Sequence, residues 1–222
     1  MKNVIYGQYD SYFYPLKRFY EPEIPSRVRE VLLELSQKEL AVFRGGLAYV
    51  FLLNEKEYLL KDLDMLGHTE NRDDILACLG DSDVIYVNKN TFGDTVITAF
   101  WKYDDEYFKL DILLCNEMPS VCEKSINGKK CYMVTASYVW RNRIEKIAEK
   151  KIRMHDDKKT LNHFKVARVL SQYLKENEDA ILVEDCIVVK EKLPEVQKVL
   201  SELVSISDLE QFMNQILELV RG

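Results

Sequence analysis

The sequence has few of the residues that mark secreted or metal-stapled proteins. Only five of its 222 residues are cysteine, and no two of them form a C-x-x-C pair. An odd number of cysteines without this spacing fits a reducing cytoplasm better than a disulfide framework or a zinc site. The three histidines show no H-E-x-x-H spacing, and with only eight glycines and five prolines extensive disorder is not expected.

Long apolar runs and an excess of positive charge are also missing. No segment approaches 18 uncharged apolar residues, and the first 25 residues lack the apolar core of a signal peptide. We therefore expect a cytoplasmic protein that makes no use of a membrane. The formal net charge is −6, which argues against nucleic-acid binding through the charge of the protein as a whole. A local basic face could still bind nucleic acid.

Hydrophobic periodicity predicts an α+β protein. Residues 1–135 are expected to form a mixed sheet with flanking helices and an aromatic N-terminal arm, and residues 136–222 a C-terminal helical domain. Asn127 and Gly128 are a strong hairpin signal in the first part. The other strands of this part are expected within 39–43, 57–66, 82–90, 94–103 and 106–117, and its helices from Ser26, directly after Gly46 and within 71–80.

The second part has the spacing of four helices. They are predicted within 137–154, 156–177, 193–204 and from Ser207, where Ser207 and Glu210 match a capping box. On the first of them, basic residues recur at helical intervals and form a basic stripe. A polyanionic acceptor and a plainly solvated helix face both explain such a stripe, which consists of Arg143, Lys146, Lys150 and Arg153.

The stretch from Phe43 to Leu66, FRGGLAYVFLLNEKEYLLKDLDML, holds the most chemical information. Asp62 and Asp64 are two residues apart on an expected strand, so both carboxylates project to one side, close enough to share Mg²⁺ ions. The alternative is an ordinary solvated acidic strand end. Gly45 and Gly46 precede an expected helix, where exposed N–H groups approach a phosphate closely; the alternative is a tight turn.

A third acid, Asp111, interrupts the otherwise apolar run FKLDILL. An unpaired carboxylate is costly in a buried strand, so Asp111 needs a partner. One alternative is an ion pair with a lysine or arginine. If its strand lies beside the strand of Asp62 and Asp64, the three acids converge into the ligand set of two-metal phosphoryl transfer. No Walker lysine follows the glycines, so a P-loop enzyme is not supported.

The segment from Arg44 to Asp64 resembles the first motif of the minimal nucleotidyltransferases related to DNA polymerase beta. The resemblance is strongest to the AbiEii branch, the toxin half of a bacterial abortive-infection and toxin–antitoxin system. That branch has a basic residue, G-G, a small-residue helix and D-x-D, as in RGGLAYVFLL followed by KDLDML, and its third acid matches Asp111. AEKK, within the first expected helix of the second part, resembles a later motif and places the triphosphate-contacting lysine at Lys150, with Lys151 as the fallback.

The resemblance implies a metal-dependent enzyme that moves a nucleoside monophosphate from an NTP to an acceptor hydroxyl on RNA such as tRNA, on a protein or on a small molecule. An antitoxin protein is a further implied partner. A departure lies in the segment from Lys158 to His163, because the family's next motif has aspartates where this chain has Thr160, Leu161, Asn162 and His163. The alternative is a catalytically silent binding module or protein-interaction partner. The implied catalytic residues and ligands of two Mg²⁺ are Asp62, Asp64 and Asp111, and the implied triphosphate contacts are Gly45, Gly46 and Lys150.

Overall fold

The computed structural model describes residues 4–177 and 180–221. The chain divides into two compact units, Met1–Val134 and Thr135–Gly222. The first is a mixed sheet with flanking helices and the second is helical, so the predicted α+β fold class is confirmed. Within the described residues, no helix combines the length and the apolar character needed to cross a membrane.

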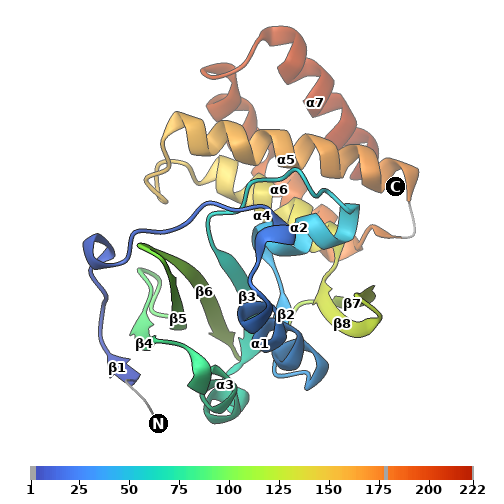
Figure 1. Ribbon diagram of the computed structural model, residues 1–222. Helices are drawn as coiled ribbons and strands as arrows, with labels where there is room; N and C mark the ends of the chain where they lie inside the picture. The colour runs from blue at the N-terminus through green and yellow to red at the C-terminus, as the bar shows by residue number, and fades with distance from the viewer. Residues whose placement is uncertain (1–3, 178–179, 222) are drawn as a thin grey trace. The chain divides into compact units, whose positions relative to one another are not determined.

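An eight-stranded mixed sheet, in the order β1-β4-β5-β6-β3-β2-β8-β7, is the core of the first unit (Figure 1). Its central strands carry many of the buried apolar side chains of this unit, and their removal from water stabilises the sheet. The strands are β1 Val4–Tyr6, β2 Ala41–Phe43, β3 Leu63–His68, β4 Val84–Lys89, β5 Thr95–Tyr103, β6 Glu106–Cys115, β7 Val121–Ile126 and β8 Lys129–Val134.

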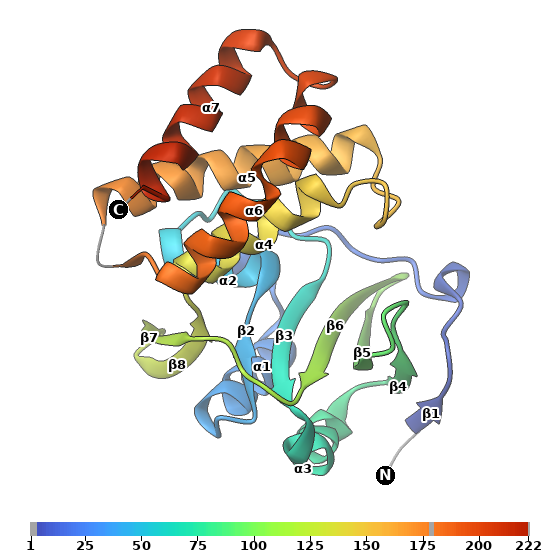
Figure 2. The ribbon, with the colours of Figure 1, turned by 180° about the vertical axis from the view of Figure 1, so that it is seen from behind.

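Strand β6 lies at the centre of the sheet between β3 and β5 (Figure 2). It runs parallel to β3 and antiparallel to β5. Helix α3 (Arg72–Cys78) and strands β4 and β5 lie between β3 and β6 in the chain. The pairing of β3 with β6 therefore makes direct neighbours of residues that are about 50 positions apart in the sequence. The hairpin of β7 and β8 turns at Asn127 and Gly128, both at positive φ as the sequence predicts.

The α-helices described in this unit are α1 Ser26–Gln37, α2 Gly45–Leu53 and α3 Arg72–Cys78. Helix α2 starts directly after β2 and is buried nearly all round, which confirms the predicted strand, glycine pair and buried helix. Residues 4–24 form an arm with little regular structure. Its Phe19 is fully buried and exchanges backbone hydrogen bonds with Leu60.

The predicted strand over 57–66 is wrong at its start. Strand β3 begins only at Leu63, because Leu60 pairs with Phe19 of the N-terminal arm and not with the sheet. Asp64 is therefore the second residue of β3, whereas Asp62 lies just before the strand. The two carboxylates remain two residues apart at the point where the chain enters the sheet.

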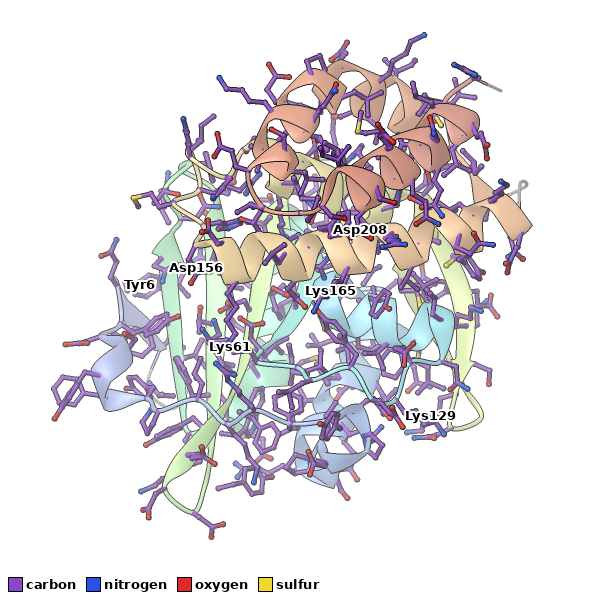
Figure 3. All side chains as sticks on the ribbon, turned by 90° about the horizontal axis from the view of Figure 1, so that it is seen from above. Tyr6, Lys61, Lys129, Asp156, Lys165 and Asp208 are labelled. Atoms are coloured by element: carbon purple, nitrogen blue, oxygen red, sulfur yellow. The ribbon has the colours of Figure 1, made fainter. Side chains whose placement is uncertain are left out.

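The helical unit consists of α4 Ala136–Ala148, α5 Asp157–Glu176, α6 Val183–Ser201 and α7 Ile206–Leu219. Helix α4 packs against α5 and α6, and α7 packs against α5 and α6. Figure 3 shows α5 with Asp156 at its N-terminal end and Lys165 further along it. The Asp156 side chain accepts a hydrogen bond from the Lys159 N–H group and so caps the helix.

Three helix boundaries differ from the prediction. Helix α4 ends at Ala148 rather than continuing to 154, since the chain turns there and Met154 adopts a left-handed conformation. Helix α6 begins ten residues earlier than the predicted segment over 193–204 and keeps Pro194 in its interior. Helix α7 is capped by Ser205, whose hydroxyl accepts from the Asp208 N–H group, instead of the predicted Ser207 and Glu210.

Candidate functional site

Asp64 and Asp111 occupy matching positions on the neighbouring parallel strands β3 and β6. Residues in register on adjacent strands are only about 4.8 Å apart and their side chains point to the same face. Asp62 lies two residues before Asp64, so the three acids meet at the N-terminal end of β3, beside the middle of β6. The strand pairing on which the predicted convergence depends is therefore present in the structure.

Lys109 joins two of these acids. Its Nζ lies 2.7 Å from Asp111 Oδ2 and 3.3 Å from Asp62 Oδ2, and its side chain is only 9% exposed. The ion pair that the sequence left open as an alternative for Asp111 is thus also present. The K-x-D spacing in FKLDILL carries this signal, because residues two apart on a strand share a face.

The remaining oxygen of Asp111 is also held. Thr98 on β5 lies opposite Asp111, and its hydroxyl donates a 2.8 Å hydrogen bond to Asp111 Oδ1. The Tyr9 hydroxyl of the N-terminal arm lies within electrostatic range of Lys109 and Asp111. Burial raises the pKa of the Tyr9 hydroxyl, and the positive charge of Lys109 acts in the opposite direction. Asp111 is therefore fixed in orientation from both sides.

Burial is the main electrostatic influence on the site. It raises the pKa of the Asp62 carboxyl, and the negative charge of Asp64 raises it further, while Lys109 acts in the opposite direction. Burial alone would lower the pKa of Lys109, but Asp111 and Asp62 more than offset this and raise it. Lys109 is therefore a permanent cation, and the site still holds more negative than positive charge.

The donor set suits Mg²⁺, which prefers carboxylate oxygens. Asp64 forms no ion pair within the part of the chain that the structure describes, so its negative charge, close to that of Asp62, has no cation of its own. Across residues 4–177 and 180–221, however, no group of three or more His, Cys, Asp or Glu side chains is arranged to hold a metal. The Lys109 ammonium lies between Asp62 and Asp111, and it must move before a metal ion can bridge them.

Gly45 begins α2 directly against the Asp64 carboxylate. Its φ is +64°, and a Cβ at this position would collide with Asp64 Oδ2. The Arg44 N–H group donates a 3.0 Å hydrogen bond to the Asp64 carbonyl oxygen, which holds the start of α2 on β3. The positive end of the α2 dipole therefore lies beside Asp64. Gly46 is also crowded, though less so, because a Cβ there would lie 2.9 Å from Leu60 Cδ2.

Replacing Gly45 by alanine should destabilise the protein. A non-glycine residue at positive φ costs about 1–3 kcal/mol, which corresponds to a melting temperature lower by about 2–4 °C for each kcal/mol. The measurement is a thermal melt of both chains in EDTA. The matched control is Gly80→Ala, where a Cβ meets open space and φ is not positive. Equal losses for the two variants would contradict the packing of Gly45 on Asp64.

The predicted triphosphate residue Lys150 does not lie on a helix. It follows the end of α4, and its Nζ forms an ion pair with the Asp157 carboxylate. The predicted basic stripe is also wrong, because Arg143 is buried and because Lys150 and Arg153 lie beyond the helix end. Lys150 belongs to the second unit, and its contact with a triphosphate stays a prediction.

Comparison with known proteins identifies the fold. No protein-family model matches the chain, and no curated protein matches its sequence. Among solved structures, an antigenic nucleotidyltransferase-like protein from Paracoccidioides brasiliensis matches with a TM-score of 0.54 at 12% identity, covering 90% of this chain and 95% of that chain. The chain has a nucleotidyltransferase-like fold.

A second solved structure supports the same nucleotidyltransferase-like fold. ANT(2″)-Ia, solved in complex with adenylyl-2″-tobramycin, matches with a TM-score of 0.50 at 14% identity, covering 75% of this chain and 95% of that chain. At these identities the likeness extends to the fold and not to individual site residues. The roles of Asp62, Asp64, Asp111, Gly45 and Gly46 therefore depend on the geometry described above.

Proposed function

We propose that the protein is a metal-dependent nucleotidyltransferase, which moves a nucleoside monophosphate from an NTP to an acceptor hydroxyl and releases pyrophosphate. The observation that carries this proposal is the meeting of Asp62, Asp64 and Asp111 beside the glycine-led start of α2. Carboxylates on neighbouring strands can bind cations, and the N–H groups at the start of a helix beside them can bind phosphate oxygens, so one site can hold both. The nucleotidyltransferase-like fold supports the same reaction class.

The three acids have different roles in this proposal. Asp62, Asp64 and Asp111 would hold two Mg²⁺, which, when bound, activate the attacking oxygen and neutralise the leaving phosphates. Asp111 is held by Thr98 and Lys109 in one orientation, so it is placed to accept the proton of the acceptor hydroxyl. Lys109 must first move to admit the metal, and the Thr98 hydroxyl would then still hold Asp111 in this orientation.

Phosphate groups would be held by backbone N–H groups and by a lysine. The N–H groups at Gly45 and Gly46 are placed to donate to the triphosphate at the start of α2. Lys150 is proposed as the cation that offsets charge on the leaving pyrophosphate, for which it must exchange its Asp157 partner for phosphate. This exchange is feasible because Asp157 is largely exposed and its ion pair is correspondingly weak.

The acceptor is proposed as a hydroxyl on RNA, including tRNA, on a protein or on a small molecule. ANT(2″)-Ia, which was solved in complex with adenylyl-2″-tobramycin, is a protein of similar fold that binds an adenylylated small molecule. The resemblance of the segment Arg44–Asp64 to the AbiEii branch supports a cytoplasmic toxin with an antitoxin partner. Incubation with each labelled NTP and candidate acceptors would distinguish these classes.

A catalytically silent binding module is the second candidate. One observation favours it: the Lys109 ammonium already neutralises part of the charge of Asp62 and Asp111 without any metal ion. A silent module of this kind would bind neither Mg²⁺ nor NTP at the acids. Pyrophosphate release measured with each NTP, in Mg²⁺ and in EDTA, separates the two candidates.

Saturating Mg²⁺ and a non-hydrolysable NTP should raise the melting temperature. A ligand that binds only the native state at 100 times its Kd adds about 2.7 kcal/mol, or roughly 5–11 °C for a chain of this size. Melts with Mg²⁺ alone, NTP alone and both together measure the effect. Coincident curves in all conditions, together with no pyrophosphate release, would overturn the proposed enzyme.

A further inference from the structure

A basic pair is buried between α4 and α5 of the helical unit. Arg143 is 5% exposed and His163 is 4% exposed, and Arg143 Nη1 lies 3.2 Å from His163 Nδ1. A guanidinium can only donate hydrogen bonds, so Nδ1 must be the acceptor. The hydrogen of the neutral His163 ring is therefore on Nε2. Neither residue has a place in the nucleotidyl-transfer site described above.

Each residue of this pair has an orphaned donor. The Nε atom of Arg143 and the Nε2 atom of His163 are buried without a hydrogen-bond partner in the described part of the chain. Within the same residues Arg143 forms no ion pair with a carboxylate, although a buried guanidinium nearly always has one. Buried polar groups are rarely left unsatisfied, and an uncompensated buried charge is more costly still.

The surroundings of the pair are positive. The ring of His155 lies 5.1 Å from the ring of His163, centroid to centroid. Burial, followed by the charges of Arg143 and Lys146, lowers the pKa of His163 to about 2, and Lys159 acts in the same direction. Burial and nearby cations also lower the pKa of His155 to about 4. The local field therefore repels additional positive charge and attracts an anion.

The missing partner of Arg143 must supply acceptor oxygens and negative charge together, whereas water can satisfy Nε2 of His163, which points away from the guanidinium. Water would satisfy the two donors but would leave the charge of Arg143 uncompensated. A phosphate group supplies both, and arginine is the side chain best suited to phosphate because its donors form a planar fork. Lys159 is exposed and His155 is only half-buried, so the cluster reaches solvent on that side.

We propose that Arg143 and His163, flanked by His155 and Lys159, form an anion site that takes a phosphate group. The carrier is either free phosphate or pyrophosphate, or a nucleotide. The site differs from the Lys150 position that the family resemblance implies, because Lys150 already pairs with Asp157. It needs neither the three acids nor a metal ion, and it stands whether or not the proposed transfer reaction occurs.

Titration calorimetry on the full chain in EDTA, at constant ionic strength, tests this site with inorganic phosphate, pyrophosphate and ATP. We expect Arg143→Met to weaken binding at least tenfold, and to melt no lower than the wild type because a buried uncompensated charge is removed. The control is Lys165→Met, which removes one positive charge from the exposed face of α5 (Figure 3) and should bind like the wild type. Similar binding of all three anions would assign free phosphate, and tighter binding of ATP would assign a nucleotide.

A second measurement does not depend on the variants. In protein labelled with ¹⁵N-histidine, phosphate should shift the ring nitrogens of His163 and leave those of His68, in the first unit, unchanged. No binding of any anion at millimolar concentration would overturn the site, as would equal binding by Arg143→Met. Because no Mg²⁺ and no turnover are involved, this result is independent of the pyrophosphate assay.

Discussion

Pyrophosphate release is expected to fall by at least about 10²–10³-fold when Asp64 is replaced by asparagine. The asparagine side chain would keep the shape that packs against Gly45 but would lose the charge that, in our proposal, holds Mg²⁺. Asp62→Asn should have a similar effect, since a neutral amide is a poor ligand for this ion. The measurement is the initial rate with saturating NTP and Mg²⁺.

The matched control is Asp105→Asn, an exposed acid in the turn between β5 and β6. It removes the same charge from the chain and should leave the rate unchanged. An unchanged rate in both Asp62→Asn and Asp64→Asn would end the two-metal proposal. A loss in all three variants would point to net charge and not to the site.

Loss of activity in Asp62→Asn should not come from unfolding. Burial and Asp64 raise the pKa of Asp62 in the folded state, so its ionised form is the disfavoured one. A carboxyl group whose pKa is higher in the folded state than in the unfolded state stabilises the fold fully only at a pH below its unfolded-state pKa. This stabilisation is lost as the pH rises through the folded-state pKa. At pH 7 the charge is therefore a cost, and in EDTA the variant should melt at or above the wild-type temperature.

The local pattern predicts the framework of this site well. The strand before Gly45, the buried helix after Gly46 and the hairpin at Asn127 all depend on short-range rules of periodicity and backbone conformation. The acids at Asp62 and Asp64 stand out for the same reason. Their spacing of two residues is a local feature of the sequence, although Asp62 lies just before the strand predicted to carry it.

What the pattern does not predict depends on long-range contacts. The start of β3 shifts to Leu63 because Phe19, about 40 residues earlier, pairs with Leu60. Arg143 looks like part of a solvated stripe, but packing of α5 over α4 buries it beside His163. Periodicity within one helix predicts which of its faces is buried, but it does not predict which other helix packs against that face.

Lys109→Met is expected to destabilise the metal-free protein more than any of the other substitutions. It leaves Asp111 and Asp62 without their shared cation in a largely buried site. Breaking such a pair costs about 3 kcal/mol, the lower end of the usual range because Asp62 is partly exposed, and corresponds to a melting temperature lower by roughly 6–12 °C. Lys102→Met, at an exposed position of β5, is the control and should change little.

The same variant tests whether Lys109 stands in a place that a metal ion can take. If it does, Mg²⁺ should restore much of the stability lost in Lys109→Met, and should raise the melting temperature of this variant more than that of the wild type. The double variant Lys109→Met with Asp62→Asn should lose less in EDTA than Lys109→Met alone, since one uncompensated charge is then gone. Additive losses and no response to Mg²⁺ would mean that Lys109 only packs beside the acids. A strong Mg²⁺ response would mean that its ammonium and the metal compete for the carboxylates of Asp62 and Asp111, so that the lysine keeps the site folded until the metal–nucleotide complex arrives.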